Sequence, residues 1–237
     1  MKHAYQILLS LHYAGDLSVD TMLPEMWQFI QQLSRLSPNL NGWLLAGPSK
    51  EEASLYEVYK DGKPTAAAKA ALENRLEGKI DPRIITMWNG KDDHEGASLR
   101  FMGRPKEHLS LITFDGYPQS FSPDWRAIAE VLIAGAAIWT PHYISVESNG
   151  YRERKIFKDR PGIGWMQYLP TVLTVQQVPE ARALVPVLGA GNKQIGTIIV
   201  SVIDAPFSDE NPDHVKIANA IEIRLVDQDL LPRYADL

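Results

Sequence analysis

Two short stretches of the sequence carry side chains that could hold a metal ion for hydrolysis. In the first, Asp61 lies upstream of the triplet Glu77-Gly78-Lys79. A metal-dependent nuclease of this pattern needs two carboxylates on the ion and a lysine near the attacking water, with the triplet on a strand. Glu77 instead ends a strongly helical segment at residues 64–78, and Gly78 suits the left-handed C-cap of a helix. The pattern therefore favours a helix terminus over a nuclease site.

The second stretch is the acidic cluster KDDHE at residues 91–95. Its carboxylates and imidazole could bind a divalent cation. The cluster directly follows Asn89-Gly90 and separates two predicted strands, so a solvated hairpin loop explains it without a metal. The six His residues show no pair at the four-residue spacing of a helical zinc motif. A metal-dependent hydrolase that uses one of these two stretches stays as an alternative function.

Other common catalytic motifs are missing from the sequence. The chain has no Cys, which excludes a thiol nucleophile, a disulfide framework and Cys-ligated zinc. The glycine pairs at 162–164 and 189–191 lack the third glycine and the strand-to-helix context of a phosphate-binding loop. No G-x-S-x-G elbow is present. We therefore predict that the protein is not an enzyme and uses no metal or other cofactor.

Hydrophobic periodicity predicts the elements that would position any site. Alternating apolar residues predict a strand over residues 5–13, and three- and four-residue spacing predicts a helix between Asp20 and Ser37-Pro38. The final segment after Asn211-Pro212 favours a helix, although the alternation over residues 221–225 also fits a strand. Further strands are predicted at 42–47, 83–89, 97–103, 108–114, 142–148, 182–188 and 194–203, and further helices at 64–78 and from Ser122-Pro123-Asp124 to residue 139.

These elements mix without a regular βαβ rhythm. The order predicts an α+β fold in which mainly antiparallel sheet packs with amphipathic helices. We expect an N-terminal half at residues 1–120 and a C-terminal half at 121–237, packed together as one compact unit. The longest apolar run, residues 131–139, is about half of the roughly 20 residues that span a bilayer. Because the N-terminus also lacks a convincing signal peptide, we expect a cytoplasmic protein that binds no membrane; the oligomeric state stays open.

Acidic residues gather in the last part of the chain. Residues 204–237 hold eight acids against three bases, which equals the net charge of −5 of the whole sequence. An acidic surface disfavours nucleic acid as a direct ligand and suits a basic protein partner. Such charge runs more often only solvate helices and loops, so both interpretations stay open. The candidate partner-binding acids are Asp204, Asp209, Glu210, Asp213, Glu222, Asp227 and Asp229.

Two aromatic residues stand in the stretch DRPGIGWMQYLP at residues 159–170. Trp165 and Tyr168 could anchor a partner, because large rings bury much area at a small entropic cost. They could equally belong to the core, since residues 165–169 alternate as a strand would and large aromatics are mostly buried. We favour the core and keep both residues as candidate contacts.

Several stretches together resemble the immunity protein 52 family. The resemblance is strong over residues 150–237 and patchy before them. It implies an antidote encoded beside an antibacterial toxin with a restriction-endonuclease-like nuclease domain, often delivered by type VI secretion. The implied function is to bind this nuclease effector and prevent DNA cleavage; a small-molecule- or peptide-binding module is the other alternative. The stretches are DRPGIGWMQYLP (159–170), VPEARALVPV (178–187), GNKQIGTIIVSV (191–202) and ANAIEIRLVDQDLLPRYADL (218–237), with DPR (81–83) and WNG (88–90).

Overall fold

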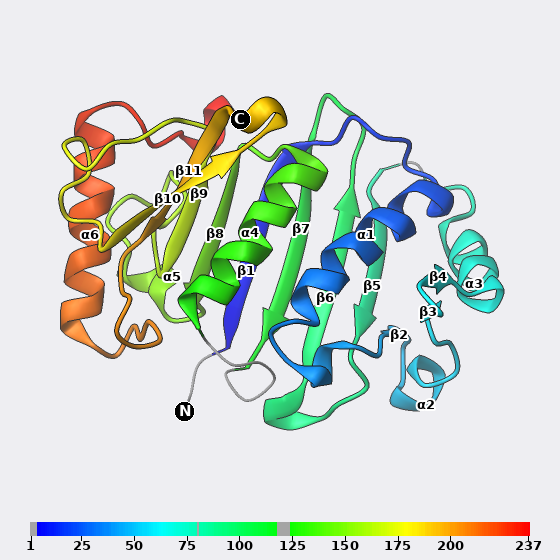
Figure 1. Ribbon diagram of the computed structural model, residues 1–237. Helices are drawn as coiled ribbons and strands as arrows, with labels where there is room; N and C mark the ends of the chain where they lie inside the picture. The colour runs from blue at the N-terminus through cyan, green and yellow to red at the C-terminus, as the bar shows by residue number, and fades with distance from the viewer. Residues whose placement is uncertain (1–3, 80, 118–123) are drawn as a thin grey trace. The chain divides into compact units, whose positions relative to one another are not determined.

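The structure is a computed structural model that describes residues 4–79, 81–117 and 124–237. Figure 1 shows a large sheet with helices on it, and a two-stranded sheet beside α3. The large sheet has nine strands, and its neighbouring strands pair mainly antiparallel. The predicted α+β class is therefore confirmed. None of the described helices has the length and apolar character needed to cross a bilayer.

The nine strands are arranged in the order β10-β11-β9-β8-β1-β7-β6-β5-β2. Strands β3 (Tyr59–Lys60) and β4 (Lys63–Pro64) form the small sheet. The bounds in the large sheet are β1 (Tyr5–His12), β2 (Leu44–Leu45), β5 (Arg83–Trp88), β6 (Ala97–Gly103), β7 (Leu109–Gly116), β8 (Tyr143–Ser148), β9 (Met166–Leu169), β10 (Ala183–Leu188) and β11 (Gln194–Val200). The helices are α1 (Val19–Leu33), α2 (Lys50–Ala53), α3 (Ala66–Leu76), α4 (Trp125–Trp139), α5 (Tyr151–Arg154) and α6 (Pro212–Asp227).

The chain divides into two compact units, one of which is Ser10–Ser122. In this unit β5, β6 and β7 form the predicted antiparallel meander. Helix α1 begins at Ser18, whose side chain accepts a hydrogen bond from the Thr21 amide, and it packs against α3 and β4. The predicted start of α3 at Pro64 is wrong, because Pro64 belongs to β4 and Thr65 caps the helix.

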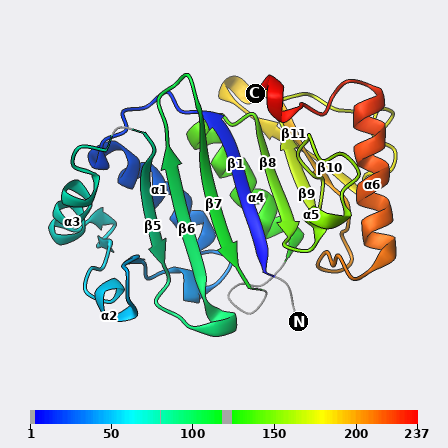
Figure 2. The ribbon, with the colours of Figure 1, turned by 180° about the vertical axis from the view of Figure 1, so that it is seen from behind.

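The other unit comprises Met1–Leu9 and Pro123–Leu237. Helix α4 packs against β8, β10 and β11 and buries Ile128, Leu132 and Ala136. Figure 2 shows the face of these strands opposite α4, where α5 lies. The predicted hairpin of β10 and β11 is present, and the final element is the helix α6. The described residues of this unit contain the candidate sites below.

Candidate functional site

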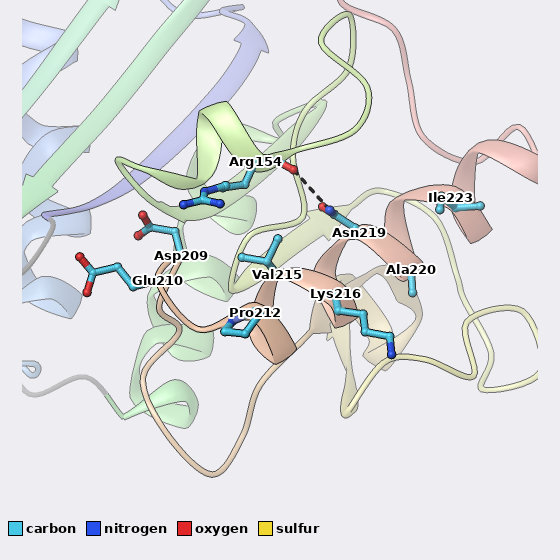
Figure 3. Close-up of a pocket in the computed structure, with 9 residues that line it drawn as sticks. All are labelled: Arg154, Asp209, Glu210, Pro212, Val215, Lys216, Asn219, Ala220 and Ile223. Atoms are coloured by element: carbon cyan, nitrogen blue, oxygen red, sulfur yellow. Dashed lines mark hydrogen bonds between the residues drawn. The ribbon is translucent and has the colours of Figure 1, made fainter.

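A groove of about 500 Å³ runs along the outer face of α6 (Figure 3). Its floor is apolar, and Ile223 in it is 43% exposed. Figure 3 shows the Asp209 and Glu210 carboxylates near the Arg154 side chain at one end and Ile223 at the other. The groove is lined by Arg154, Asp209, Glu210, Pro212, Val215, Lys216, Asn219, Ala220 and Ile223.

Helix α6 supplies this floor because its sequence has two separate faces. The Asn211 side chain accepts the Asp213 amide, and Pro212 occupies the first turn, so the helix starts with a satisfied cap. Val215, Asn219 and Ile223 recur every four residues and face the groove. The buried face carries Ala218, Ile221, Glu222 and Leu225. One helix thus contributes to the core and offers a second, outward stripe.

The buried carboxylate of Glu222 ties α6 to the segment before β9. Its Oε1 accepts hydrogen bonds from the Tyr151 hydroxyl at 2.6 Å and from the Ile163 amide at 3.2 Å, and its Oε2 accepts from the Ile156 amide at 2.9 Å. Burial, together with the charge and hydrogen bond of Glu222, raises the pKa of Tyr151 well above its ordinary value. The Asn219 side chain adds a hydrogen bond to the Arg154 carbonyl at 3.3 Å. This network holds α5 beside the groove.

Asp209 forms the inner corner of the groove and is only 6% exposed. The Ser148 hydroxyl donates to its Oδ1 at 2.6 Å. The carboxylate packs so closely on Gly150 that a side chain at position 150 would overlap it. Burial and then the charge of Asp209 raise the pKa of Tyr5 to about 12. Asp209 therefore shapes this end of the groove from inside the fold.

The other predicted acids lie around α6 in different environments. Glu210 is exposed on the rim of the groove, whereas Asp204 and Asp213 line a separate cleft of about 430 Å³ with Arg182. Asp227 and Asp229 are exposed at the C-terminal end of the helix. Glu222 is fully buried. The structure thus brings Asp209 and Glu210 together at the groove and does not gather all seven acids on one face.

Trp165 and Tyr168 are both buried, at 1% exposure each. The Trp165 indole donates to the Val202 carbonyl at 2.9 Å, and its ring packs on Tyr5 with 5.4 Å between centroids. Tyr168 pairs with Ile198 in the β9–β11 ladder, where burial raises the pKa of its hydroxyl. In this arrangement neither ring offers a partner any surface. The stretch DRPGIGWMQYLP supplies β9 and core contacts.

The comparison with known sequences identifies the family. The profile of immunity protein 52 matches residues 18–233. The chain belongs to the immunity protein 52 family. No curated protein sequence matches it. The solved structure titled Pseudomonas aeruginosa T6SS protein PA0821 is similar over 93% of this chain and 73% of its own, with a TM-score of 0.53 and 14% identity. At this identity the likeness concerns the fold alone.

The two stretches considered for metal chemistry are exposed loops and helix ends in this immunity protein 52 member. Asp61 lies in the β3–β4 turn, and Glu77 and Lys79 follow α3. Residues 93–95 form a short 3-10 helix between β5 and β6. Across residues 4–79, 81–117 and 124–237, no group of three or more His, Asp or Glu side chains could hold a metal ion.

Sequence reasoning missed the apolar residues of the groove in this immunity protein 52 member. Val215 was not considered, and Ile223 was considered only as part of an alternation over residues 221–225 that also fits a strand. The spacing of 215, 219 and 223 carries the signal, since a second stripe beside the buried one indicates a helix with two apolar faces.

Proposed function

We propose that this protein binds a cognate antibacterial nuclease toxin, prevents DNA cleavage by it, and uses the α6 groove as the docking surface. Membership of the immunity protein 52 family supports an immunity function. The groove supports a protein partner, because exposed Ile223 and half-buried Val215 form an apolar centre within a charged rim. Protein interfaces commonly have this anatomy of an apolar core surrounded by polar groups.

The acidic surface around the start of α6 supports a nuclease as the partner. A nuclease carries positive charge where it grips phosphates, so an acidic inhibitor surface gains association rate by steering. Glu210 on the groove rim and Asp213 in the first turn of α6 are both exposed. Asp209 adds a buried carboxylate to the groove, where the Ser148 hydroxyl holds it. The proposed partner therefore presents a basic patch to this end of the groove and an apolar residue to its centre.

The cellular setting is part of the proposal. The fold is similar to a protein whose title places it in the type VI secretion system of Pseudomonas aeruginosa. We propose that the toxin is delivered by such a system and that this protein meets it in the cytoplasm, where the DNA lies. The nuclease is expected to be encoded beside the gene for this protein.

Binding to that neighbouring gene product tests the proposal directly. Isothermal titration should give a dissociation constant below 1 μM, and an equimolar amount should protect plasmid DNA from the toxin. Ile223→Asp places a charge at the centre of the groove and is expected to weaken binding at least about tenfold, or 1.4 kcal/mol. The matched control is Ile195→Asp, which places the same charge at an exposed isoleucine on β11. No binding at micromolar concentration would refute the function, and equal effects of the two variants would refute the groove.

A further inference from the structure

A third hollow, a cleft of about 310 Å³, is lined by residues of α5, which lies on the face of the sheet opposite α4 (Figure 2). Its floor comes from alternate residues of two neighbouring strands, Gln6 and Leu8 of β1 and Tyr143, Ser145 and Glu147 of β8. Helix α5 and the turn that follows it form the wall. The volume is at the lower end of the range for small-ligand pockets, roughly 300 to 1,000 Å³. The cleft shares no lining residue with the α6 groove.

Cationic groups converge on this cleft from one wall. Arg152, Lys155 and Lys158 line it, and no ion pair among the described residues joins any of them to a carboxylate. Lys155 is only 8% exposed, which is unusual for an ammonium group that lacks an ion-pair partner. Glu147 is the carboxylate whose charge interacts with Lys155 and Arg152, so these cations favour the binding of an anion when Glu147 is neutral.

Each of these cations keeps hydrogen-bond donors available. The Lys155 ammonium donates to the Arg160 carbonyl at 2.6 Å and to the Tyr234 hydroxyl at 3.0 Å. The Lys158 ammonium donates to the carbonyls of Arg152 and Glu153 at 3.0 and 3.2 Å. An ammonium has three N–H donors and a guanidinium has five, so donors remain on every one of them. The bonds to carbonyls fix the two ammonium groups in place without neutralising them.

The strand next to the floor holds a second unsatisfied group. Gln167 of β9 lies opposite Ser145 in the β8–β9 ladder, so its side chain leaves the sheet on the same face as the cleft floor. The side chain is fully buried, and its amide nitrogen and oxygen have no hydrogen-bond partner among the described residues. Buried amides are nearly always hydrogen-bonded, and those that are not call for an explanation. Unused hydrogen-bonding groups thus lie beside the cleft, on Gln167, as well as on the cations of its wall.

We propose that this cleft binds the phosphate of a small solute, or free inorganic phosphate. Arg152 and Lys158 approach from the wall and Lys155 is held beside Tyr234, while the Ser145 side chain in the floor is hydrogen-bonded to Glu147. Two lysines and one arginine on one wall suit a phosphate, because lysine is a common phosphate-binding residue and acts on it as a point charge. The basic toxin proposed for the α6 groove would be repelled here.

Glu147 in the floor makes this binding depend on pH. It is packed against Gly162 and Gly164, which leave room for its side chain. Burial raises the pKa of Glu147 to about 7, Lys155 and Arg152 oppose the rise, and Glu222 adds to it. The other ionisable groups that face this region are Tyr143, Tyr151, Glu153, Lys158 and Tyr234. A neutral Glu147 can donate to an oxyanion, whereas an ionised one repels it, so affinity should rise as pH falls through about 7.

Sulfate is the first probe, because it mimics phosphate but does not titrate between pH 6 and 8. At constant ionic strength, a ¹H–¹⁵N titration should show saturable shifts confined to α5, the turn after it and β8. If only the form with neutral Glu147 binds, the dissociation constant should be about tenfold higher at pH 8 than at pH 6. Glu147→Gln should bind equally at both pH values.

Charge-removing variants at the wall complete the test. Lys158→Gln and Arg152→Gln change exposed side chains and should each weaken sulfate binding several-fold, while Lys193→Gln on the distant β10–β11 turn should not. Glycerol 2-phosphate separates the two sources of the anion: tighter binding than sulfate indicates a phosphorylated solute, and equal binding indicates the free ion. Shifts that fail to saturate, or equal weakening by Lys193→Gln, would overturn the site.

Discussion

The Tyr151 hydroxyl donates a 2.6 Å hydrogen bond to the Glu222 carboxylate, although 71 residues separate them in the sequence. Tyr151 begins α5, which lines both the α6 groove and the cleft of about 310 Å³. Glu222 lies on the buried face of α6. The same carboxylate accepts the backbone amides of Ile156 and Ile163. One buried side chain therefore sets the position of the whole segment between α5 and β9.

Replacing this carboxylate should destabilise the fold strongly. Glu222→Gln keeps the shape but gives up one acceptor atom and the charge, and it is expected to lower the free energy of unfolding by about 3 kcal/mol. Tyr151→Phe should lower it by about 1 to 2 kcal/mol. The effects should be less than additive in the double variant, because the two groups share one hydrogen bond. Urea denaturation measures all three, with exposed Asp227→Asn as the control that leaves stability unchanged. Full additivity would contradict the network.

Trp165 should matter for folding before it matters for binding. Its ring is buried, and its indole holds the Val202 carbonyl. Trp165→Ala is expected to cost roughly 3 to 5 kcal/mol. Because Tyr168 is equally buried, Tyr168→Ala should cost a similar amount. The melting temperatures of wild type and of the two variants, measured by thermal unfolding, give the comparison. A Trp165→Ala protein with an unchanged melting temperature and lost toxin binding would reverse this assignment.

The stability of the protein should fall between about pH 4.5 and pH 7 through Glu147. Burial raises the pKa of this carboxyl from 4.5 to about 7, so the folded state binds more protons than the unfolded state in this window. Stability contributed by the neutral group is present below about pH 4.5 and is lost as pH rises through 7. Relative to wild type, Glu147→Gln should gain stability over this window, by at most about 3 kcal/mol. Urea denaturation across pH checks it, and parallel pH curves for the two proteins would refute it.

Sequence reasoning predicted most of the elements, because local periodicity and caps determine them. For α6 it met a real ambiguity, since the alternation of Ile221, Ile223 and Leu225 also fits a strand. The structure explains it: Ile221 and Leu225 face the core while Ile223 faces the groove. The segment after Tyr151 is rich in basic residues, yet it begins as the short helix α5, and its Lys155 and Arg160 are buried.

The sites were less predictable because they depend on pairing between distant segments. Nothing near Glu222 in the sequence indicates that Tyr151 will meet it. Lys155 is buried because its ammonium reaches the Arg160 carbonyl and the Tyr234 hydroxyl, which come from the following turn and the C-terminus. Strand order likewise depends on pairing between distant segments, since β1 lies between β8 and β7 in the large sheet. Composition revealed an excess of acids but not which of them face solvent.

The acidic surface should act on the rate of toxin association. Glu210 and Asp213 are exposed, whereas Asp209 is buried against Ser148, so the reversal is confined to Glu210→Lys and Asp213→Lys. Rim charges act chiefly on the association rate. The double variant should associate several-fold more slowly at low salt and nearly as fast as wild type near 0.5 M, where the Debye length is roughly 4 Å. Stopped-flow rates across ionic strength decide it, and parallel salt slopes would place the toxin elsewhere.

The protein itself should not cut DNA. Asp61, Glu77 and Lys79 are exposed at a turn and beyond a helix end, and the described residues offer no metal-binding cluster. Plasmid incubated with the purified protein and Mg²⁺ or Mn²⁺ should stay supercoiled on an agarose gel. Reproducible cleavage that disappears in Glu77→Ala would instead establish a metal-dependent hydrolase.

The two faces of α6 separate what keeps the protein folded from what a toxin would touch. Substitutions at Val215 or Ile223 alter the outer stripe, while Ile221, Glu222 and Leu225 hold the helix from the other side. A lineage of such antidotes can thus exchange outer residues one at a time as its toxins diverge, with the inner anchor unchanged. New pairs of immunity protein and toxin can then arise while every intermediate sequence still folds, because the buried contacts of α6 are kept.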